Sequence, residues 1–174
     1  MPLALSRSSS VPKPKTADLE ALLEALVHGG VEFVVVGGAA AVLHGAPVTT
    51  VDLDIVHRRS DENVDRLLAV LDALEAEVRP PRDPPIRPTR EMLLGQGQLN
   101  LATSLGPLDP LCQLHSGEGY EELIDKAVLL TDGDLEIRAI DLDTLIRIKS
   151  EAGRDRDKLA VPILIALRNR RTGE

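Results

Sequence analysis

Two aspartates separated by one residue interrupt an apolar run of this 174-residue chain, and they constrain its fold more than any other feature. The stretch 37–56 reads GGAAAVLHGAPVTTVDLDIV. If its last residues form a strand, Asp52 and Asp54 share one face while Leu53 and Ile55 point into the core. The two carboxylates then lie roughly 6–7 Å apart, the spacing of alternate residues in a strand. One face of this strand must therefore open to solvent or to a cation.

A hard divalent cation would neutralise the two carboxylates, and an oxygen-only site favours Mg²⁺ or Mn²⁺. The alternative is a solvated pair of acids on an edge strand. Gly37 and Gly38 directly follow the apolar run Phe33–Val36, with 13 residues between them and Asp52. Glycines there let the backbone approach a ligand, and free N–H groups at a helix N-terminus bind phosphate. Together these features indicate a nucleoside triphosphate (NTP), although the chain has neither a G-x-G-x-x-G nor a P-loop motif.

The rest of the pattern predicts an α/β (α+β) fold, a mixed sheet flanked by helices. Helices are expected from Asp18 to Gly29–Gly30, over 61–76, near 119–125 and over 142–170, the last as two helices that meet near Gly153. Strands are expected at 32–36 and 51–56, on both sides of Gly106-Pro107, and at 127–131 and 134–140. We expect a disordered tail over 1–16, a core over 17–141 and a C-terminal helical segment over 142–174.

Composition excludes several classes of protein. A formal net charge of −8 and a pI near 5.0 argue against a protein that coats long DNA, and an aromatic content of 1% argues against stacked single strands. One cysteine, no apolar run long enough for a membrane span and no signal peptide together indicate a cytoplasmic protein.

A proline- and arginine-rich segment, 79–90, cannot form a regular helix and is expected to be a stiff loop. Its four arginines are Arg79, Arg82, Arg87 and Arg90. They form either a solvated loop or a guide for an acidic acceptor such as a tRNA end, with the RNRR run at 168–171 as a second basic patch.

At these motifs the chain resembles the DNA polymerase β-like nucleotidyltransferase superfamily. The stretch VVVGGAAAVLHGAPVTTVDLDI looks like that of small bacterial nucleotidyltransferases of the abortive-infection and toxin–antitoxin type. The segment GPLDPL resembles their later strand with a third acid, here Asp109, and LDTLIRIKSEAGRDRDKLAVPIL resembles their C-terminal helices. The resemblance covers roughly residues 18–168. One departure is Val48, where the family often has an arginine.

The resemblance implies that Asp52, Asp54 and Asp109 hold the metals, and that Asp109 also takes the proton of the attacking hydroxyl. From the sequence alone, Asp109 could equally be a turn residue before Pro110. Gly37 and Gly38 would hold the triphosphate through backbone amides.

Three further residues have two interpretations each. Lys149 either extends its stem along the core or contacts a phosphate. Arg154 either forms a helix pair with Asp157 or contacts a nucleotide phosphate, as the family motif implies. His44 either braces the glycine turn or lies near the nucleotide.

The function that the resemblance implies is Mg²⁺- or Mn²⁺-dependent transfer of a nucleoside monophosphate from an NTP to an acceptor hydroxyl, with release of pyrophosphate. The acceptor is an RNA, a protein or a small molecule, and the chain would be the toxin of a toxin–antitoxin pair if an antitoxin protein accompanies it. No membrane and no long DNA are expected as partners. The alternative function, motivated by Val48, is a nucleotide-binding regulatory module without turnover.

Overall fold

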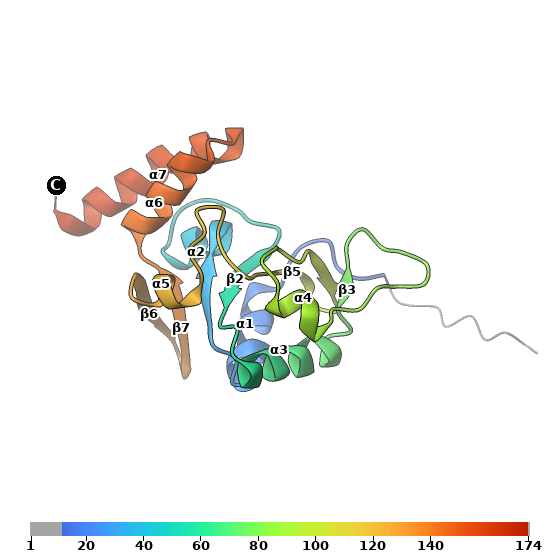
Figure 1. Cartoon of the computed structure of the whole chain (residues 1–174). Helices are drawn as coiled ribbons and strands as arrows, with labels where there is room; N and C mark the ends of the chain where they lie inside the picture. Colours follow the sequence, from blue (N-terminus) through green and yellow to red (C-terminus); the bar gives the residue numbers. More distant parts are fainter. Residues whose placement is uncertain (1–11, 174) are drawn as a thin grey trace, which may run out of the picture.

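Seven strands form one mixed sheet in this computed structural model, which describes residues 12–173 (Figure 1). Their order across the sheet is β3-β4-β5-β2-β1-β7-β6. The strands are β1 (Phe33–Val36), β2 (Leu53–His57), β3 (Glu77–Val78), β4 (Leu101–Thr103), β5 (Gly106–Leu111), β6 (Ala127–Asp132) and β7 (Leu135–Ile140). The helices are α1 (Leu19–His28), α2 (Gly37–Leu43), α3 (Asp61–Ala73), α4 (Arg90–Leu94), α5 (Tyr120–Ile124), α6 (Leu142–Ala152) and α7 (Asp155–Thr172).

The central strands combine both directions of pairing, which confirms the predicted mixed sheet. β2 pairs antiparallel with β1 and parallel with β5, and β1 pairs parallel with β7 on its other side. Because β2 lies in the middle of the sheet, Asp54 is not on an edge strand, and Asp52 directly precedes the same strand. Among residues 12–173, no helix has both the length and the apolar character that a membrane crossing requires.

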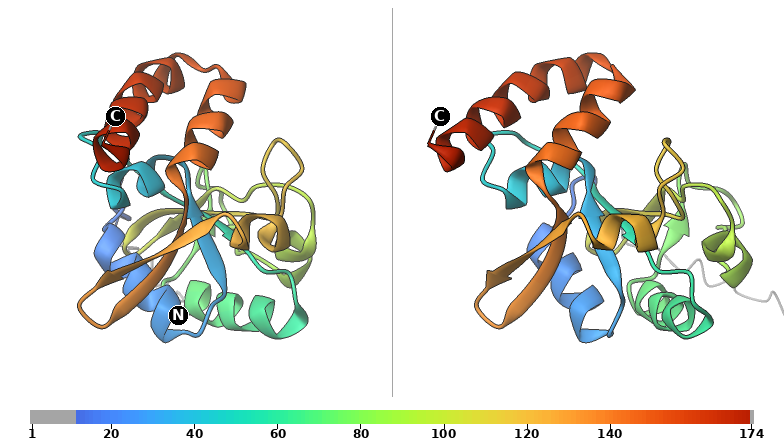
Figure 2. Two further views of the ribbon diagram at one scale, coloured as in Figure 1. Left: turned by 90° about the vertical axis from the view of Figure 1, so that its left-hand side faces the viewer. Right: turned by 60° about the vertical axis from the view of Figure 1, so that its left-hand side comes forward.

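Helices cover the two faces of the sheet. Figures 1 and 2 show α1 and α3 together on one side, with α6 and α7 on the other. The α1–α3 layer presents leucines that have no exposed surface, among them Leu22 and Leu67, and Leu53 and Ile55 are equally buried. Since side chains alternate along a strand, Asp54 points away from this layer, toward α6 and α7.

Local signals place the helix ends. The Asp18 side chain accepts a hydrogen bond from the Ala21 N–H at the start of α1, and Asp141 caps α6 in the same way. Gly153 ends α6 with a φ of 61°, a left-handed conformation that glycine adopts without strain. The predicted break between the two C-terminal helices is therefore confirmed.

The structure differs from the prediction in one segment, the predicted loop 79–90, and adds a contact just after another, the predicted tail 1–16. Within the predicted loop 79–90, Arg90 instead begins the short helix α4. Of the predicted tail 1–16, residues 1–11 lie outside the described residues. Just after the tail, the backbone N–H of Ala17 donates to the Val51 carbonyl at 2.8 Å, so the chain enters the fold directly before the acid strand.

Candidate active site

One row of side chains runs across the middle of the sheet on the face toward α6 and α7. Val36 of β1 lies opposite Asp54 of β2, and Asp54 lies opposite Asp109 of β5. Residues directly opposite each other in neighbouring strands point to the same face. The strand register, set over a separation of 55 residues, therefore brings the two carboxylates together.

The same row continues beyond Asp109 into a segment that sequence analysis did not single out. Two pairs of opposite residues define the register here: Leu101 with Leu108, and Gln98 with Leu111. By this register Asn100 lies opposite Asp109, and the backbone N–H of Arg79 donates to the Asn100 carbonyl at 2.7 Å. The row is thus Val36–Asp54–Asp109–Asn100–Arg79, and we call it the site row.

Three carboxylates meet at the centre of the site row. Asp52, just before β2, Asp54 and Asp109 each offer a carboxylate oxygen, and these oxygens lie within 4.8 Å of one another. The Thr50 hydroxyl orients Asp52 by donating to its Oδ1 at 3.2 Å and to its backbone carbonyl at 3.0 Å. The structure therefore brings together all three acids that the sequence and the resemblance proposed, and Asp109 lies within β5 rather than in a turn.

The three acids oppose one another electrostatically. Burial and the neighbouring charges of Asp52 and Asp109 raise the pKa of Asp54 from 3.8 to about 7. Burial also raises the pKa of Asp109, although the Arg79 guanidinium works in the other direction. Three oxygen ligands that repel when ionised fit a hard divalent cation, which would remove the repulsion.

The glycine turn is shaped by its contact with the acids. Gly37 has a φ of 64°, and a Cβ on it would lie 2.4 Å from Oδ2 of Asp54. A Cβ on Gly38 would lie 2.8 Å from the Thr50 hydroxyl. A side chain at Gly37 would displace the Asp54 carboxylate, and one at Gly38 would displace the Thr50 hydroxyl that orients Asp52. The glycines therefore allow a close approach of the backbone to these side chains.

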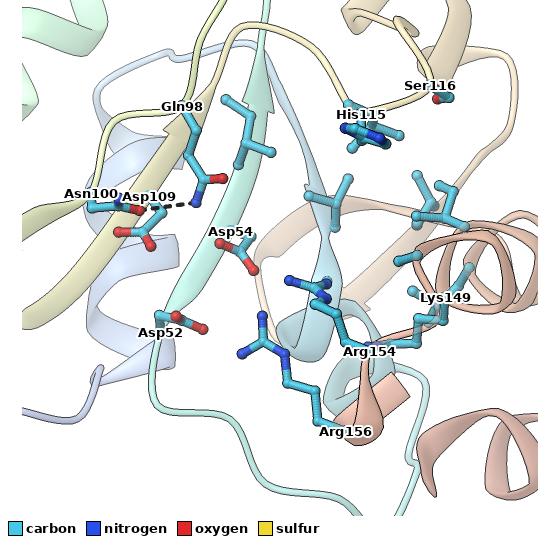
Figure 3. Close-up of a pocket in the computed structure, with 18 of the residues that line it drawn as sticks. Asp52, Asp54, Gln98, Asn100, Asp109, His115, Ser116, Lys149, Arg154 and Arg156 are labelled. Carbon is cyan, nitrogen blue, oxygen red and sulfur yellow. Dashed lines mark hydrogen bonds between the residues drawn. The ribbon is translucent and has the colours of Figure 1, made fainter. Parts of the chain in front are cut away.

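A cavity of about 960 Å³ opens above the site row (Figure 3). Asp52, Asp54, Asp109 and Gly37 line one side of it, and Gly38 is not among the lining residues. Aliphatic side chains form part of the remaining lining: Leu111, Leu114, Ile140, Leu145 and Ile148.

Cations from α6, from α7 and from the turn between them face the acids across this cavity. Lys149, Arg154 and Arg156 line it, and Figure 3 shows the two arginines directed toward Asp52 and Asp54. Both arginines act to lower the pKa of Asp54. Of the three cations, sequence analysis proposed Lys149 and Arg154 but not Arg156, two positions further along the same GRDRD motif.

A buried acid holds two of these cations. Asp157, whose side chain has no exposed surface, accepts from Lys149 Nζ at 3.1 Å and from Arg154 Nε at 2.7 Å. Burial raises the pKa of Asp157, but the bonds from Arg154 and Lys149 outweigh it and lower that pKa overall. Arg154 therefore pairs with Asp157, which is one of the two interpretations offered by the sequence. Lys149 pairs with the same carboxylate in addition to packing its stem.

On the other side of the acids lie two amides that sequence analysis did not single out, together with Arg79, which it placed only in a basic loop. Arg79 forms an ion pair with Asp109, and the Leu101 N–H donates to the same carboxylate oxygen at 3.2 Å. Gln98 Nε2 donates to Asn100 Oδ1 at 3.0 Å, and both amides are exposed in the cavity. These contacts depend on strand register, so only a prediction of the 97–103 pairing could have found them.

His44 lies outside the cavity lining. It is buried, its Nε2 lies 2.7 Å from the Ile140 carbonyl, and Arg171 donates to its backbone carbonyl at 2.7 Å. The residue thus connects the end of α2 to β7 and α7, away from the acids.

Most arginines of the two predicted basic patches are paired with acids. Arg87 contacts Asp72 at 3.2 Å, Arg90 contacts Asp61 at 2.6 Å, and Arg168 contacts Asp143 at 3.2 Å. Val48, the departure from the family pattern, is half-buried and packs against the core.

No model of a protein family matches the chain, and no curated protein matches it in sequence. Several solved structures share its fold. The lincosamide antibiotic adenylyltransferase LnuA, solved with lincomycin bound, has a TM-score of 0.62 at 14% identity, over 88% of this chain and 99% of that one.

Two other structures agree with this result. The antibiotic-resistance factor ANT(2'')-Ia has a TM-score of 0.54 at 12% identity, over 85% of this chain and 80% of that one. TM1012 from Thermotoga maritima, a proposed nucleotidyltransferase, has a TM-score of 0.51 at 16% identity, over 85% and 90% of the two chains. The fold is therefore that of nucleotidyltransferases, as the resemblance predicted.

Proposed function

We propose that this chain, which has the nucleotidyltransferase fold, transfers a nucleoside monophosphate from an NTP to an acceptor hydroxyl. The observation that carries the proposal is the meeting of Asp52, Asp54 and Asp109 within 4.8 Å on one side of a cavity whose other side is cationic. Carboxylates for divalent cations opposite cations for phosphates are the two parts that phosphoryl transfer requires.

In this proposal the three acids hold two divalent cations, Mg²⁺ or Mn²⁺. Bound there, the cations supply Lewis-acid activation of the α-phosphate and neutralise charge on the leaving group. The acceptor oxygen forms a bond to the α-phosphorus while the bond to the bridging oxygen of the pyrophosphate breaks. Asp109 takes the proton of the acceptor hydroxyl, and burial favours this role because it raises the pKa of the carboxyl.

Lys149, Arg154 and Arg156 bind the triphosphate and the departing pyrophosphate in this scheme. Asp157 holds Lys149 and Arg154 in position through its two hydrogen bonds. Gly37 keeps the cavity open beside the α-phosphate, since any side chain there would occupy the space of the Asp54 carboxylate.

The test is transfer from NTPs labelled at the α-phosphate, with Mg²⁺ or Mn²⁺ and a cell extract. We expect label in an acceptor and release of pyrophosphate with the wild type, and neither with Asp54→Asn. Asp134→Asn, in the exposed turn between β6 and β7, is the matched control and should behave as the wild type. Equal transfer by the wild type and Asp54→Asn would refute the proposal.

The ion pair of Arg79 with Asp109 favours one alternative, a nucleotide-binding module without turnover. A cation at Asp109 would have to displace this guanidinium, and Val48 stands where the family often has an arginine. Tight binding of NTP and Mg²⁺ without release of pyrophosphate would support this alternative.

The resemblance also proposes a toxin role, with an antitoxin as partner. Growth arrest on expression of the wild type, but not of Asp54→Asn, is the corresponding test. Normal growth with both proteins would contradict it.

A further inference from the structure

Two amide side chains beside Asp109 have no part in the scheme above. Asn100 lies opposite Asp109 in the site row, and Gln98 lies on the same face two residues earlier. Their one mutual hydrogen bond uses Gln98 Nε2 and Asn100 Oδ1. Within residues 12–173 no other hydrogen bond uses the Asn100 amino group or the Gln98 carbonyl oxygen, so both are available to a molecule in the cavity.

The position of these amides follows from the geometry of the reaction. In an in-line displacement, the attacking oxygen and the leaving pyrophosphate lie on opposite sides of the α-phosphorus. Lys149 and Arg156 come from α6 and α7, and Arg154 from the turn between them, whereas Gln98 and Asn100 lie beyond Asp109 in the sheet (Figure 3). With the triphosphate on the cationic side, the acceptor enters on the amide side.

Arg79 lines this side of the cavity. Its guanidinium binds Asp109, while its Nε–H is buried without a hydrogen-bond partner among residues 12–173. Pro80 and Pro81 follow it in the lining and add apolar rings to it. This part of the cavity therefore offers amides, apolar rings and a single guanidinium that is already paired.

These groups suit an uncharged acceptor better than a polymer of phosphates. An RNA acceptor needs several free cations along its path, because phosphate contacts supply most of its affinity. Of the seven arginines in the two predicted basic patches, four are paired with acids: Arg79, Arg87, Arg90 and Arg168. Arg171 binds His44, so among residues 12–173 only Arg82 and Arg170 of these patches lack a side-chain partner, and the chain has a net charge of −8. Amide groups recognise hydroxyls through paired donor and acceptor bonds.

We propose that Gln98, Asn100 and Arg79 form the acceptor subsite, and that the acceptor is a small, uncharged molecule with several hydroxyl groups. This inference rests on the proposed nucleotidyl transfer. Gln98 and Asn100 bind the acceptor so that one hydroxyl lies against Asp109.

The experiment supplies α-labelled NTP and Mg²⁺ to the full chain with three separate probes: the small-molecule filtrate of a cell extract, purified total tRNA, and the protein fraction. We expect a labelled product with the filtrate only. Asn100→Ala and Gln98→Ala should each raise the filtrate concentration for half-maximal transfer by roughly two- to tenfold, the loss of one neutral hydrogen bond. The NTP concentration for half-maximal transfer should stay within about twofold, because neither amide touches the triphosphate.

Two controls make the assignment specific. Lys149→Ala should have the opposite effect: it should raise the NTP concentration for half-maximal transfer and leave the filtrate concentration for half-maximal transfer unchanged. Gln96→Ala, at an exposed position outside the cavity lining, should follow the wild type in both.

Several results would overturn the inference. Label in tRNA or protein would make the acceptor a polymer, and an amide variant that changes only the NTP requirement would assign Gln98 and Asn100 to the nucleotide. If pyrophosphate release depends on Asp54 but every probe yields only free nucleoside monophosphate, the acceptor subsite is overturned. The proposed use of NTP at the three acids would stand. No pyrophosphate release with any probe would refute the proposed function, and the subsite with it.

Discussion

Replacing Asp54 with asparagine should stabilise the metal-free protein above neutral pH while it abolishes transfer. Asp54 is half-buried between Asp52 and Asp109, and its pKa is raised from 3.8 to about 7 by burial and by those two charges. Asparagine has nearly the same shape and carries no charge. The substitution therefore removes repulsion from the folded state with little change in packing.

The magnitude follows from the pKa difference between the unfolded and the folded chain. At 1.36 kcal/mol per pKa unit, a rise from 3.8 to about 7 corresponds to about 4 kcal/mol. Because the folded pKa is the higher one, the stabilising contribution of the neutral carboxyl is fully present below pH 3.8 and is lost as the pH rises through about 7. Asp54→Asn lacks this loss, so its advantage should grow between these two pH values.

The assay is urea unfolding of both proteins in a chelator from pH 4 to pH 8, with Asp134→Asn as control. The free energies of unfolding should nearly coincide at the acid end and differ by up to about 4 kcal/mol at the alkaline end. Added Mg²⁺ should raise the stability of the wild type and leave that of Asp54→Asn nearly unchanged. Parallel pH profiles would refute the reasoning, because they would show that Asp54 has the same pKa in both states.

Three further substitutions test other parts of the site. Gly37→Ala should lower the free energy of unfolding by about 2 kcal/mol or more, because it adds left-handed strain and a clash with Asp54. It should also abolish transfer. Urea unfolding and a transfer assay measure the two effects, and wild-type values in both would contradict the proposed contact. Asp157→Ala should lower the free energy of unfolding by about 3–5 kcal/mol, because it leaves Lys149 without its buried partner. It should also raise the KM for NTP, and an unchanged KM would show that Asp157 has no part in phosphate binding. His44→Ala should lower the free energy of unfolding by about 1–3 kcal/mol, since it leaves the Ile140 carbonyl without its partner. The KM for NTP should stay at the wild-type value, and a raised KM would instead place His44 near the nucleotide.

Local patterns in the sequence predicted much of the fold. Apolar spacing and caps such as Asp18 and Gly153 depend on neighbouring residues only, so α1 and the division of the C-terminal helices could be found without a structure. The alternation around Asp52 and Asp54 predicted their common face in the same way.

Features set by distant pairing could not be predicted so directly. Arg79 belongs to a segment that reads as a solvated basic loop, yet it binds Asp109, 30 residues further along. Asn100 has no distinguishing local signal and becomes part of the site only through the register of β4 with β5. His44 follows the glycine turn closely in sequence, but the helix between them directs it to β7.

The site row also has a consequence for how the chain folds. Its members come from positions 36, 54, 79, 100 and 109, and no two of them are neighbours in sequence. Asn100 and Asp109 face each other across the short β4–β5 hairpin, whereas Asp54 and Asp109 pair over 55 residues. The Asp54–Asp109 pairing should therefore form late, because it pays the entropy of a long loop before its contacts form. A nascent or partly folded chain thus holds its acids apart, and divalent-cation binding should report completion of the sheet.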